Sequence, residues 1–329
     1  MLEPIVPPPP EPVTRSPVMR RLYQRLVRVA PFDLPVLLTG ETGTGKEVAA
    51  RALHRQGANP REPFVALNCA AIAPSVAESE LFGHVRGAFT GADRTRPGAF
   101  VRARHGTLFL DEVAELSLDL QAKLLRVLET GRLVPVGADV EVEHRARVVA
   151  ATCRDLAAMV VQGRFREDLL HRLGVVVLRI PPLRERPEDI DPLLDAFADE
   201  AARRLGHPVT ITDDARRVAR RSPWPGNVRA LKNAVLRAAA LEGGVVDAEA
   251  LLRPTGLETR AAPSRAADAI AVPRGTYDQM RAHLLQTVLS ECGSIRRAAA
   301  ALGVPRSTLA EWLKKSAPPT LPTHPRAVS

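Results

Sequence analysis

The stretch GETGTGKE at residues 40–47 carries residue types and spacing that suit the binding of phosphate groups. Its glycines let backbone N–H groups turn towards phosphate oxygens, and a helix that follows adds a favourable dipole. Lys46 can place a positive charge beside the terminal phosphates of a nucleoside triphosphate. An ordinary glycine-rich turn is the alternative, but the apolar run PVLLT before it and the helical pattern after it favour a P-loop. The residues expected to contact the nucleotide are Gly40, Glu41, Thr42, Gly43, Thr44, Gly45, Lys46 and Glu47.

Two adjacent acids, Asp111 and Glu112, follow the apolar run TLFL. A strand that ends here would place both carboxylates at the carboxyl edge of a parallel sheet, where α/β proteins bind ligands. Asp111 would then hold Mg²⁺, and Glu112 would orient the attacking water. By itself such a run is usually only a strand that ends in a polar loop. Together with the P-loop it predicts a nucleoside triphosphatase.

The hexapeptide GAFTGA at residues 87–92 surrounds Phe89 with small residues. Two glycines beside one aromatic ring argue against a buried strand. A loop in solvent has little use for an unsupported phenyl ring. Phe89 therefore either packs against its own domain or contacts a partner.

The elements that must position these residues alternate between short β-branched runs and helical patterns. The expected buried parallel strands are residues 35–40, 64–67, 107–112, 147–152 and 175–180. Strands that alternate with helices predict an α/β sheet covered on both faces. We therefore expect an α/β nucleotide-binding subdomain over residues 16–182.

The rest of the chain divides by composition. The strand pattern ends after Pro181, so residues 183–252 predict a small helical subdomain. A compact helical pattern returns over residues 275–316. Segments rich in Pro or in Ala, Pro and Arg form a leader, a flexible linker and a loose tail, at residues 1–15, 253–274 and 317–329.

The totals indicate a protein with a polyanionic partner. The 329 residues carry a net charge of +9, with a pI near 10.2. Three distant cysteines without a CxxC pair offer neither a disulfide framework nor a zinc site, which suits a reducing cytosol. No apolar run approaches the roughly 18 residues that span a membrane, and the N-terminus lacks the pattern of a secretory signal. We expect a cytoplasmic protein with no membrane partner.

The P-loop, the strand that ends in two acids and GAFTGA together resemble the AAA+ ATPase domain of bacterial enhancer-binding proteins, the activators of sigma-54 RNA polymerase. The resemblance runs from about residue 16 to residue 252 and returns in the C-terminal module. It implies ATP and Mg²⁺ as cofactors and a ring, hexameric in this family. It also implies that the GAFTGA loop contacts sigma-54 from the tip of a projecting loop. The expected contact loop is Gly87, Ala88, Phe89, Thr90, Gly91 and Ala92.

Further residue roles are implied by the resemblance alone. LNCA resembles the segment whose asparagine, here Asn68, restrains Glu112 and couples hydrolysis to loop movement. GRFREDLLHRL is similar to the segment whose two arginines, here Arg166 and Arg172, reach into the neighbouring subunit's site as arginine fingers. Without the resemblance, two surface arginines in weak exposed ion pairs would be the simpler interpretation.

The segment WPGNVRALKN looks like the lid region whose arginine, here Arg229, senses the γ-phosphate from the helical subdomain. The chain also departs from the family pattern. Cys153 stands where asparagine is usual after the sensor threonine, Ala230 replaces glutamate and His105 replaces glycine. A thiol is a weak hydrogen-bond donor, so the sensor strand would read the phosphate weakly or through its threonine. Glu47 is common in this family.

Residues 284–315 have the layout of a helix-turn-helix, with a helical pattern over residues 294–302, a turn at Gly303 and Pro305 to begin the next helix. The segment resembles the Fis-type module of these activators, whose second helix lies in a major groove of double-stranded DNA. An ordinary helical hairpin is the alternative, and the positive charge favours DNA. The expected DNA contacts are Arg296, Arg297, Arg306, Ser307, Thr308, Lys314 and Lys315.

Three functions follow from these patterns. The first is an ATP-driven activator that binds upstream DNA and pushes GAFTGA loops against sigma-54 in the closed promoter complex. The second is a DNA-binding regulator with a degenerate nucleotide fold, which Cys153 keeps open and Lys46 argues against. The third, a different AAA+ machine, would not need GAFTGA. Because few residues precede the ATPase subdomain, we expect control by a separate regulatory protein, a partner subunit or expression level.

Overall fold

The computed structural model describes residues 13–253, 276–302 and 304–315. Contacts divide the chain into two compact units, one ending at Arg253 and the other beginning at Pro254. Each unit is described by itself. The predicted linker and tail, and most of the predicted leader, lie outside the described residues.

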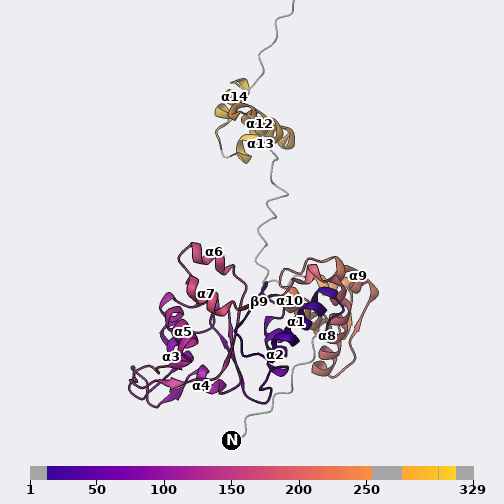
Figure 1. Ribbon diagram of the computed structural model, residues 1–329. Helices are drawn as coiled ribbons and strands as arrows, with labels where there is room; N and C mark the ends of the chain where they lie inside the picture. Colours follow the sequence, from indigo (N-terminus) through magenta and orange to yellow (C-terminus); the bar gives the residue numbers. More distant parts are fainter. Residues whose placement is uncertain (1–12, 254–275, 303, 316–329) are drawn as a thin grey trace, which may run out of the picture. The chain divides into compact units, whose positions relative to one another are not determined.

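A parallel five-stranded sheet forms the centre of the first unit (Figure 1). Its strand order is β2-β5-β8-β1-β9, and all four pairings are parallel. The strands are β1 (Val36–Thr39), β2 (Phe64–Asn68), β5 (Thr107–Asp111), β8 (Arg147–Thr152) and β9 (Val176–Arg179). All five predicted strands are therefore present, and the predicted α/β class is confirmed.

Both faces of the sheet are buried. Alternate strand residues point to opposite sides, and apolar residues on each side belong to a separate core. Leu37, Leu108 and Ala150 belong to one core, while Leu38 and Phe109 belong to the other. The second core packs against α1 (Pro17–Val29) and α2 (Lys46–Arg55). The first packs against α3 (Pro74–Phe82), α4 (Ala99–Ala103), α5 (Leu118–Thr130), α6 (Leu156–Val161) and α7 (Glu167–Leu173), as Figure 1 shows.

Two short hairpins extend from this subdomain. Strands β3 (Gly83–His84) and β4 (Arg96–Pro97) pair antiparallel and enclose GAFTGA. Strands β6 (Arg132–Leu133) and β7 (Val142–Glu143) form the second hairpin, and His84 bridges to Val136 between them. Two-residue strands are too short to show a period, so the sequence did not predict them.

Residues 183–252 form a helical subdomain with its own core, which includes Leu194, Phe197 and Trp224. We call it the lid. Two 3₁₀ turns, η2 (Leu183–Glu185) and η3 (Pro187–Asp189), lead into α8 (Ile190–Leu205), α9 (Asp213–Arg221), α10 (Asn227–Leu241) and α11 (Ala248–Leu252). The expectation of no strand after Pro181 was wrong in one detail. Strands β10 (Thr210–Ile211) and β11 (Val245–Val246) pair in parallel within the lid.

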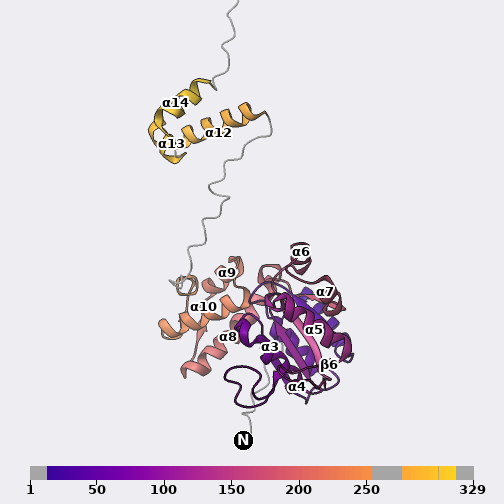
Figure 2. The same ribbon diagram turned by 90° about the vertical axis from the view of Figure 1, so that its left-hand side faces the viewer.

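The described residues of the second unit form three helices, which are visible in Figure 2: α12 (Tyr277–Cys292), α13 (Ile295–Ala301) and α14 (Arg306–Lys315). Thr276 and Gln279 form a capping box that begins α12. Leu285, Ala298 and Leu309 belong to a shared core, so the three helices pack together. The predicted turn residue Gly303 lies outside the described residues. No helix in the described ranges of either unit is long and apolar enough to cross a membrane.

Candidate functional site

The P-loop leaves β1 and turns into α2 through backbone angles that favour glycine. Gly43 and Gly45 have φ angles of +78° and +102°. The Lys46 Nζ donates to the carbonyl oxygen of Gly40 at 2.9 Å, so the side chain folds back over the loop. The lysine is buried at the start of α2, where N–H groups also point out of the helix. Loop and helix together can hold phosphate oxygens.

The two predicted acids meet this loop at the carboxyl edge of the sheet. Glu112 lies 3.4 Å from the Lys46 Nζ through its Oε1, and its Oε2 accepts the N–H of Cys153 at 3.0 Å. Burial and the adjacent Glu112 raise the pKa of the Asp111 carboxyl above its ordinary range. A half-buried carboxylate beside a second acid suits a hard cation such as Mg²⁺, which would complete its shell with waters and phosphate oxygens.

Asn68 ends β2 in register with Asp111. Its Oδ1 accepts the N–H of Ala70 at 3.0 Å, while the Glu112 carboxylate is held by Lys46 and by the backbone of Cys153. The predicted restraint of Glu112 by Asn68 therefore remains a prediction. The sequence pattern missed the Cys153 amide, because a backbone donor does not depend on residue type.

A cavity of about 300 Å³ opens beside the P-loop. It is lined by Met19 and Tyr23 of α1, by Gly45, and by Phe197 and Val228 of the lid. Burial raises the pKa of Tyr23 to about 12, so the phenol stays neutral. A mostly apolar slot next to a phosphate-binding loop suits a planar base, with its phosphates directed towards α2.

The segment before α1 is joined to the lid at this cavity. The fully buried Asp189 accepts hydrogen bonds from the Thr14 Oγ1 at 2.7 Å and from the N–H groups of Arg15 and Ser16 at 2.6 and 2.8 Å. Thr14 itself lines the cavity. One carboxylate thus holds three groups of the chain that precedes the nucleotide-binding fold.

Asn227 makes a buried polar contact between the lid and the P-loop, and the sequence analysis did not single it out. The side chain is fully buried at φ +53°, and its Oδ1 accepts the N–H of Leu183 at 2.8 Å. Its Nδ2 donates to the Thr42 carbonyl at 3.0 Å and to the Glu41 Oε2 at 3.2 Å. The asparagine in the broken helix SPWPGN was the available signal.

Glu41 also forms a two-bond ion pair with Arg184, at 2.6 and 2.7 Å. The hydrogen bonds from Arg184 and then from Asn227 lower the pKa of Glu41 to about 2. We call Glu41, Arg184 and Asn227 the latch. The Glu41 carboxyl is ionised at neutral pH, and its bonds to the other two residues hold the P-loop against the lid.

Arg229 lies in the first turn of α10, directly beside the P-loop. Its backbone N–H donates to the Gly43 carbonyl at 3.3 Å, and its side chain is exposed. A Cβ on Gly43 would come within 2.2 Å of the Gly226 carbonyl oxygen and 3.0 Å of the Arg229 Cβ. The lid and the P-loop therefore touch backbone to backbone.

The predicted fingers are exposed and interact within their own subdomain. The Arg166 guanidinium forms two hydrogen bonds to Asp168, at 2.7 and 3.1 Å. The Arg172 guanidinium donates twice to the carbonyl oxygen of Leu128, at 2.6 and 3.1 Å. Arg166 immediately precedes α7 and Arg172 lies within it. Both guanidinium groups therefore bind residues of the α/β subdomain itself.

The GAFTGA loop carries a partly exposed aromatic ring. The Phe89 ring is 43% exposed, and its edge packs against His84 with the ring centres 5.0 Å apart. The N–H of Gly87 donates to the Ala92 carbonyl at 2.9 Å, which closes the loop. Gly87 and Gly91 have φ angles of +82° and +94°. The loop has an ordered base and a ring that is neither fully buried nor free.

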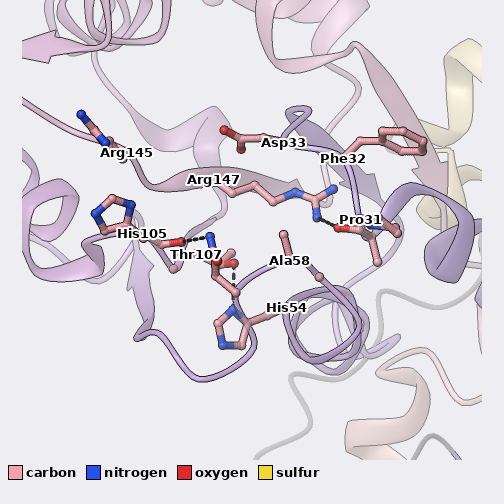
Figure 3. A pocket seen from close by; sticks show the side chains of 13 residues that line it. Pro31, Phe32, Asp33, His54, Ala58, His105, Thr107, Arg145 and Arg147 are labelled. Atoms are coloured by element: carbon pink, nitrogen blue, oxygen red, sulfur yellow. Dashed lines mark hydrogen bonds between the residues drawn. The ribbon is translucent and has the colours of Figure 1, made fainter.

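His105 lies at the other edge of the sheet, away from the P-loop. It lines a cavity of about 90 Å³, shown in Figure 3, at the amino ends of β5 and β8. In this cavity Arg147 donates to the carbonyls of Val29, Ala30 and Leu34, which fastens the end of α1. The departure at His105 therefore lies outside the nucleotide site. Ala230, in contrast, lies beside Gly226. A Cβ added to Gly226 would come within 2.9 Å of the Ala230 Cβ.

In the second unit the predicted DNA contacts lie on two helices. Arg296 and Arg297 are exposed on α13, Arg306 and Ser307 are exposed on α14, and Thr308 is half-buried. Lys314 and Lys315 belong to α14, and their side chains lie outside the described residues.

Comparison with known proteins identifies the family. The family described as "Sigma-54 interaction domain" matches residues 13–179, and the "AAA+ ATPase lid domain" matches residues 184–268. The chain belongs to the sigma-54 interaction domain family. This family membership and the fold make the first unit an AAA+ ATPase-family domain with its lid.

Two curated relatives are named as regulatory proteins. The chain is 47% identical over 252 residues to the Nif-specific regulatory protein of Azotobacter vinelandii, covering 76% of this chain and 48% of that protein. It is 52% identical over 233 residues to the anaerobic nitric oxide reductase transcription regulator NorR of Aeromonas hydrophila, covering 70% of this chain and 46% of that one. The chain thus spans about half the length of the curated relatives it matches.

Solved structures of a further protein, NtrX, share the fold. The structure of NtrX from Brucella abortus in complex with ATP has 36% sequence identity and a TM-score of 0.69, covering 94% of this chain and 70% of that chain. The complex with ADP gives 35% and 0.68, covering 93% and 69%. The NtrX structures contain ADP or ATP, and the present chain has a cavity beside its P-loop.

Proposed function

We propose that this protein is an ATP-hydrolysing activator that remodels the closed complex of sigma-54 RNA polymerase through its GAFTGA loop. The observation that carries the proposal is the partly exposed Phe89 on a loop with an ordered base, in the same subdomain as Lys46 and Glu112. Burying such a ring against a partner contributes roughly 2 kcal/mol. Membership of the sigma-54 interaction domain family supports sigma-54 as that partner.

The position of each residue supports a chemical role for it in this proposal. ATP bound at the P-loop would draw the Lys46 Nζ from the Gly40 carbonyl towards the phosphates, which would release Glu112 from its ion pair. Glu112, still held by the Cys153 N–H, would then orient the attacking water. Asp111 would hold Mg²⁺, which neutralises phosphate charge when bound. Arg229 of the same chain and Arg166 of a neighbouring subunit would contact the γ-phosphate.

A short path connects this chemistry to the loop. The N–H of Cys69 donates to the Asp111 carbonyl at 2.9 Å, and α3 is the element between β2 and the β3 strand that begins the loop. A shift at the acids would therefore move β2 and, through α3, the base of the GAFTGA loop. This supports a coupling of hydrolysis to loop position, with Asn68 at the junction.

The proposal includes three kinds of partner. Fingers that act in trans require a ring of subunits, hexameric by analogy with the family. The second unit, with its exposed arginines on α13 and α14, would bind double-stranded upstream DNA. A regulatory protein would act in trans on the assembled activator in the cytoplasm.

The test separates loop contact from hydrolysis. Thr90→Ala should retain ATP hydrolysis and DNA binding but lose open-complex formation on a sigma-54 promoter, because only the tip of the loop is changed. Lys46→Ala should lose hydrolysis and promoter opening together. Thr210→Ala, the same change on an exposed position of the lid, should behave as the parent protein. Normal promoter opening by Thr90→Ala would disprove the loop assignment.

A further inference from the structure

Gln121 is a fully buried polar side chain on α5 that contacts the segment leading into α7. Its Nε2 donates to the carbonyl oxygens of Leu116 and Arg164, at 2.8 and 3.2 Å. Its Oε1 accepts the N–H of Arg166 at 2.9 Å. Two carbonyl partners and one N–H partner fix which end of the amide is nitrogen. Every partner is a backbone group, so the amide holds chain segments rather than side chains.

Gln121 joins two segments with different proposed roles. One follows the acids of its own ATP site, and the other carries the finger for the neighbouring subunit's site. Leu116 follows the 3₁₀ turn η1 (Val113–Glu115), which begins directly after the acids Asp111 and Glu112. Arg164 and Arg166 form the entry to α7, where the proposed finger begins. The glutamine therefore connects the chain that leaves one nucleotide site to the residue offered to the next subunit.

The entry to α7 is rigid at its backbone and exposed at its side chain. Phe165 is 2% exposed and packs in the core, and the N–H of Arg164 donates to the Met159 carbonyl at 2.9 Å. The Arg166 guanidinium extends to the surface, where its partner is Asp168, an exposed carboxylate that can exchange for phosphate. The backbone of Arg166 is therefore held in place while its guanidinium remains exposed. The hydrogen bond from the Arg166 N–H to Gln121 is one of the bonds that hold it.

We propose that Gln121 is a positioning residue for the arginine finger, acting on the ATP site of the neighbouring subunit rather than on its own. The inference rests on the proposed function, because it needs Arg166 to act in trans. A finger displaced by about 1 Å costs up to about 10²-fold in rate. Gln121→Met keeps the length of the side chain and removes all three hydrogen bonds, so it should displace the finger without emptying the core.

Mixed assemblies of full-length chains separate the two sites. Lys46→Ala subunits can donate a finger but cannot use ATP, and Arg166→Ala subunits can use ATP only with a neighbour's finger. The equimolar mixture should hydrolyse ATP although each variant alone does not. If this parent mixture is inactive, the trans finger of the proposed function is wrong, whatever Gln121 does.

Gln121→Met is then placed in one partner at a time. In the finger donor, Lys46→Ala, it should reduce hydrolysis by the mixture by about 10²-fold. In the ATP-using partner, Arg166→Ala, it should leave hydrolysis close to that of the parent mixture. Equal losses in both arrangements, no loss in either, or a loss confined to the ATP-using partner would each overturn the proposal.

Folding is controlled within the same experiment. A merely unfolded subunit would fail in both arrangements, which the asymmetry excludes. Gln162→Met, the same change at an exposed glutamine between α6 and α7, should leave both mixtures unchanged. If Gln121→Met does not fold, Gln121→Leu, which is close in volume and also removes all three hydrogen bonds, must give the same asymmetry.

Discussion

Asp111 is half-buried beside Glu112, and burial and that neighbour both raise the pKa of its carboxyl. A raised pKa in the folded state means that the folded chain holds this proton more tightly than the unfolded chain does. The contribution of Asp111 to stability is therefore present at low pH and is lost as the pH rises through its folded pKa. At pH 7 the ionised carboxylate lowers the free energy of unfolding when no cation is bound.

Asp111→Asn should therefore stabilise the protein while removing its Mg²⁺-dependent hydrolysis. In buffer without nucleotide or Mg²⁺ at pH 7, we expect the thermal unfolding temperature to rise by about 2–4 °C, the effect of about 1 kcal/mol in a domain of this size. The gain should shrink as the pH falls through the pKa of Asp111. Asp139→Asn, at an exposed carboxylate, should show neither effect. A pH-independent gain would contradict the assignment of the cost to ionisation.

Among single residues, the sequence predicted those side chains that belong to motifs of fixed spacing. Lys46, Asp111 and Glu112 lie where the strand and loop patterns placed them, at one edge of the sheet. The groups that hold them were not predictable in the same way. The Cys153 contact is a backbone N–H, and Gln121 binds backbone groups of segments distant in sequence, so neither leaves a pattern of residue types.

Between elements, the latch joins the lid to the P-loop beside the hydrogen bond from Arg186 to the Thr44 carbonyl, and two residues of the latch were not predicted. Arg184 and Asn227 lie on separate turns of the lid, and only the fold brings them to Glu41. The strands were predictable, because a fully buried parallel strand is a run of apolar residues. The pair β10 and β11 was not, because two residues cannot display a run.

Asn227→Asp should weaken the closed lid, because it removes the Nδ2 donor to Glu41 and Thr42 and sets a carboxylate beside Glu41. Leu183 retains an acceptor. We expect the nucleotide dissociation constant to rise by about tenfold, the effect of about 1.4 kcal/mol. The measurement is titration calorimetry with ADP. Asn233→Asp, at an exposed position of the same helix, should bind as the parent does. Unchanged affinity in Asn227→Asp would show that the latch does not close the site.

For the whole molecule, the chain combines an AAA+ ATPase-family unit and a small helical unit that is compact by itself. Each has its own core, so a surface change in one should leave the chemistry of the other intact. This division was visible in the sequence as a change of pattern, whereas the assignment of the second unit to DNA rests on charge and helix layout.

Arg306→Ala should therefore weaken binding to the cognate DNA site by about 1–3 kcal/mol if the arginine reads a base, and it should leave basal ATP hydrolysis unchanged. Arg221→Ala removes the same charge from an exposed position of the lid and should leave DNA affinity unchanged. A fluorescence-anisotropy titration at fixed salt measures both. Equal losses in the two variants would attribute binding to overall charge rather than to α14.

The contact of Gly43 with Gly226 has a consequence for how the subunit opens and closes. Because two main chains meet there without an intervening side chain, the lid approaches the P-loop more closely than any side chain at residue 43 would allow. A single methyl group at residue 43 would fill that space permanently. The added methyl group would then hold the lid away from the P-loop, and this separation would be the same with ATP or ADP bound.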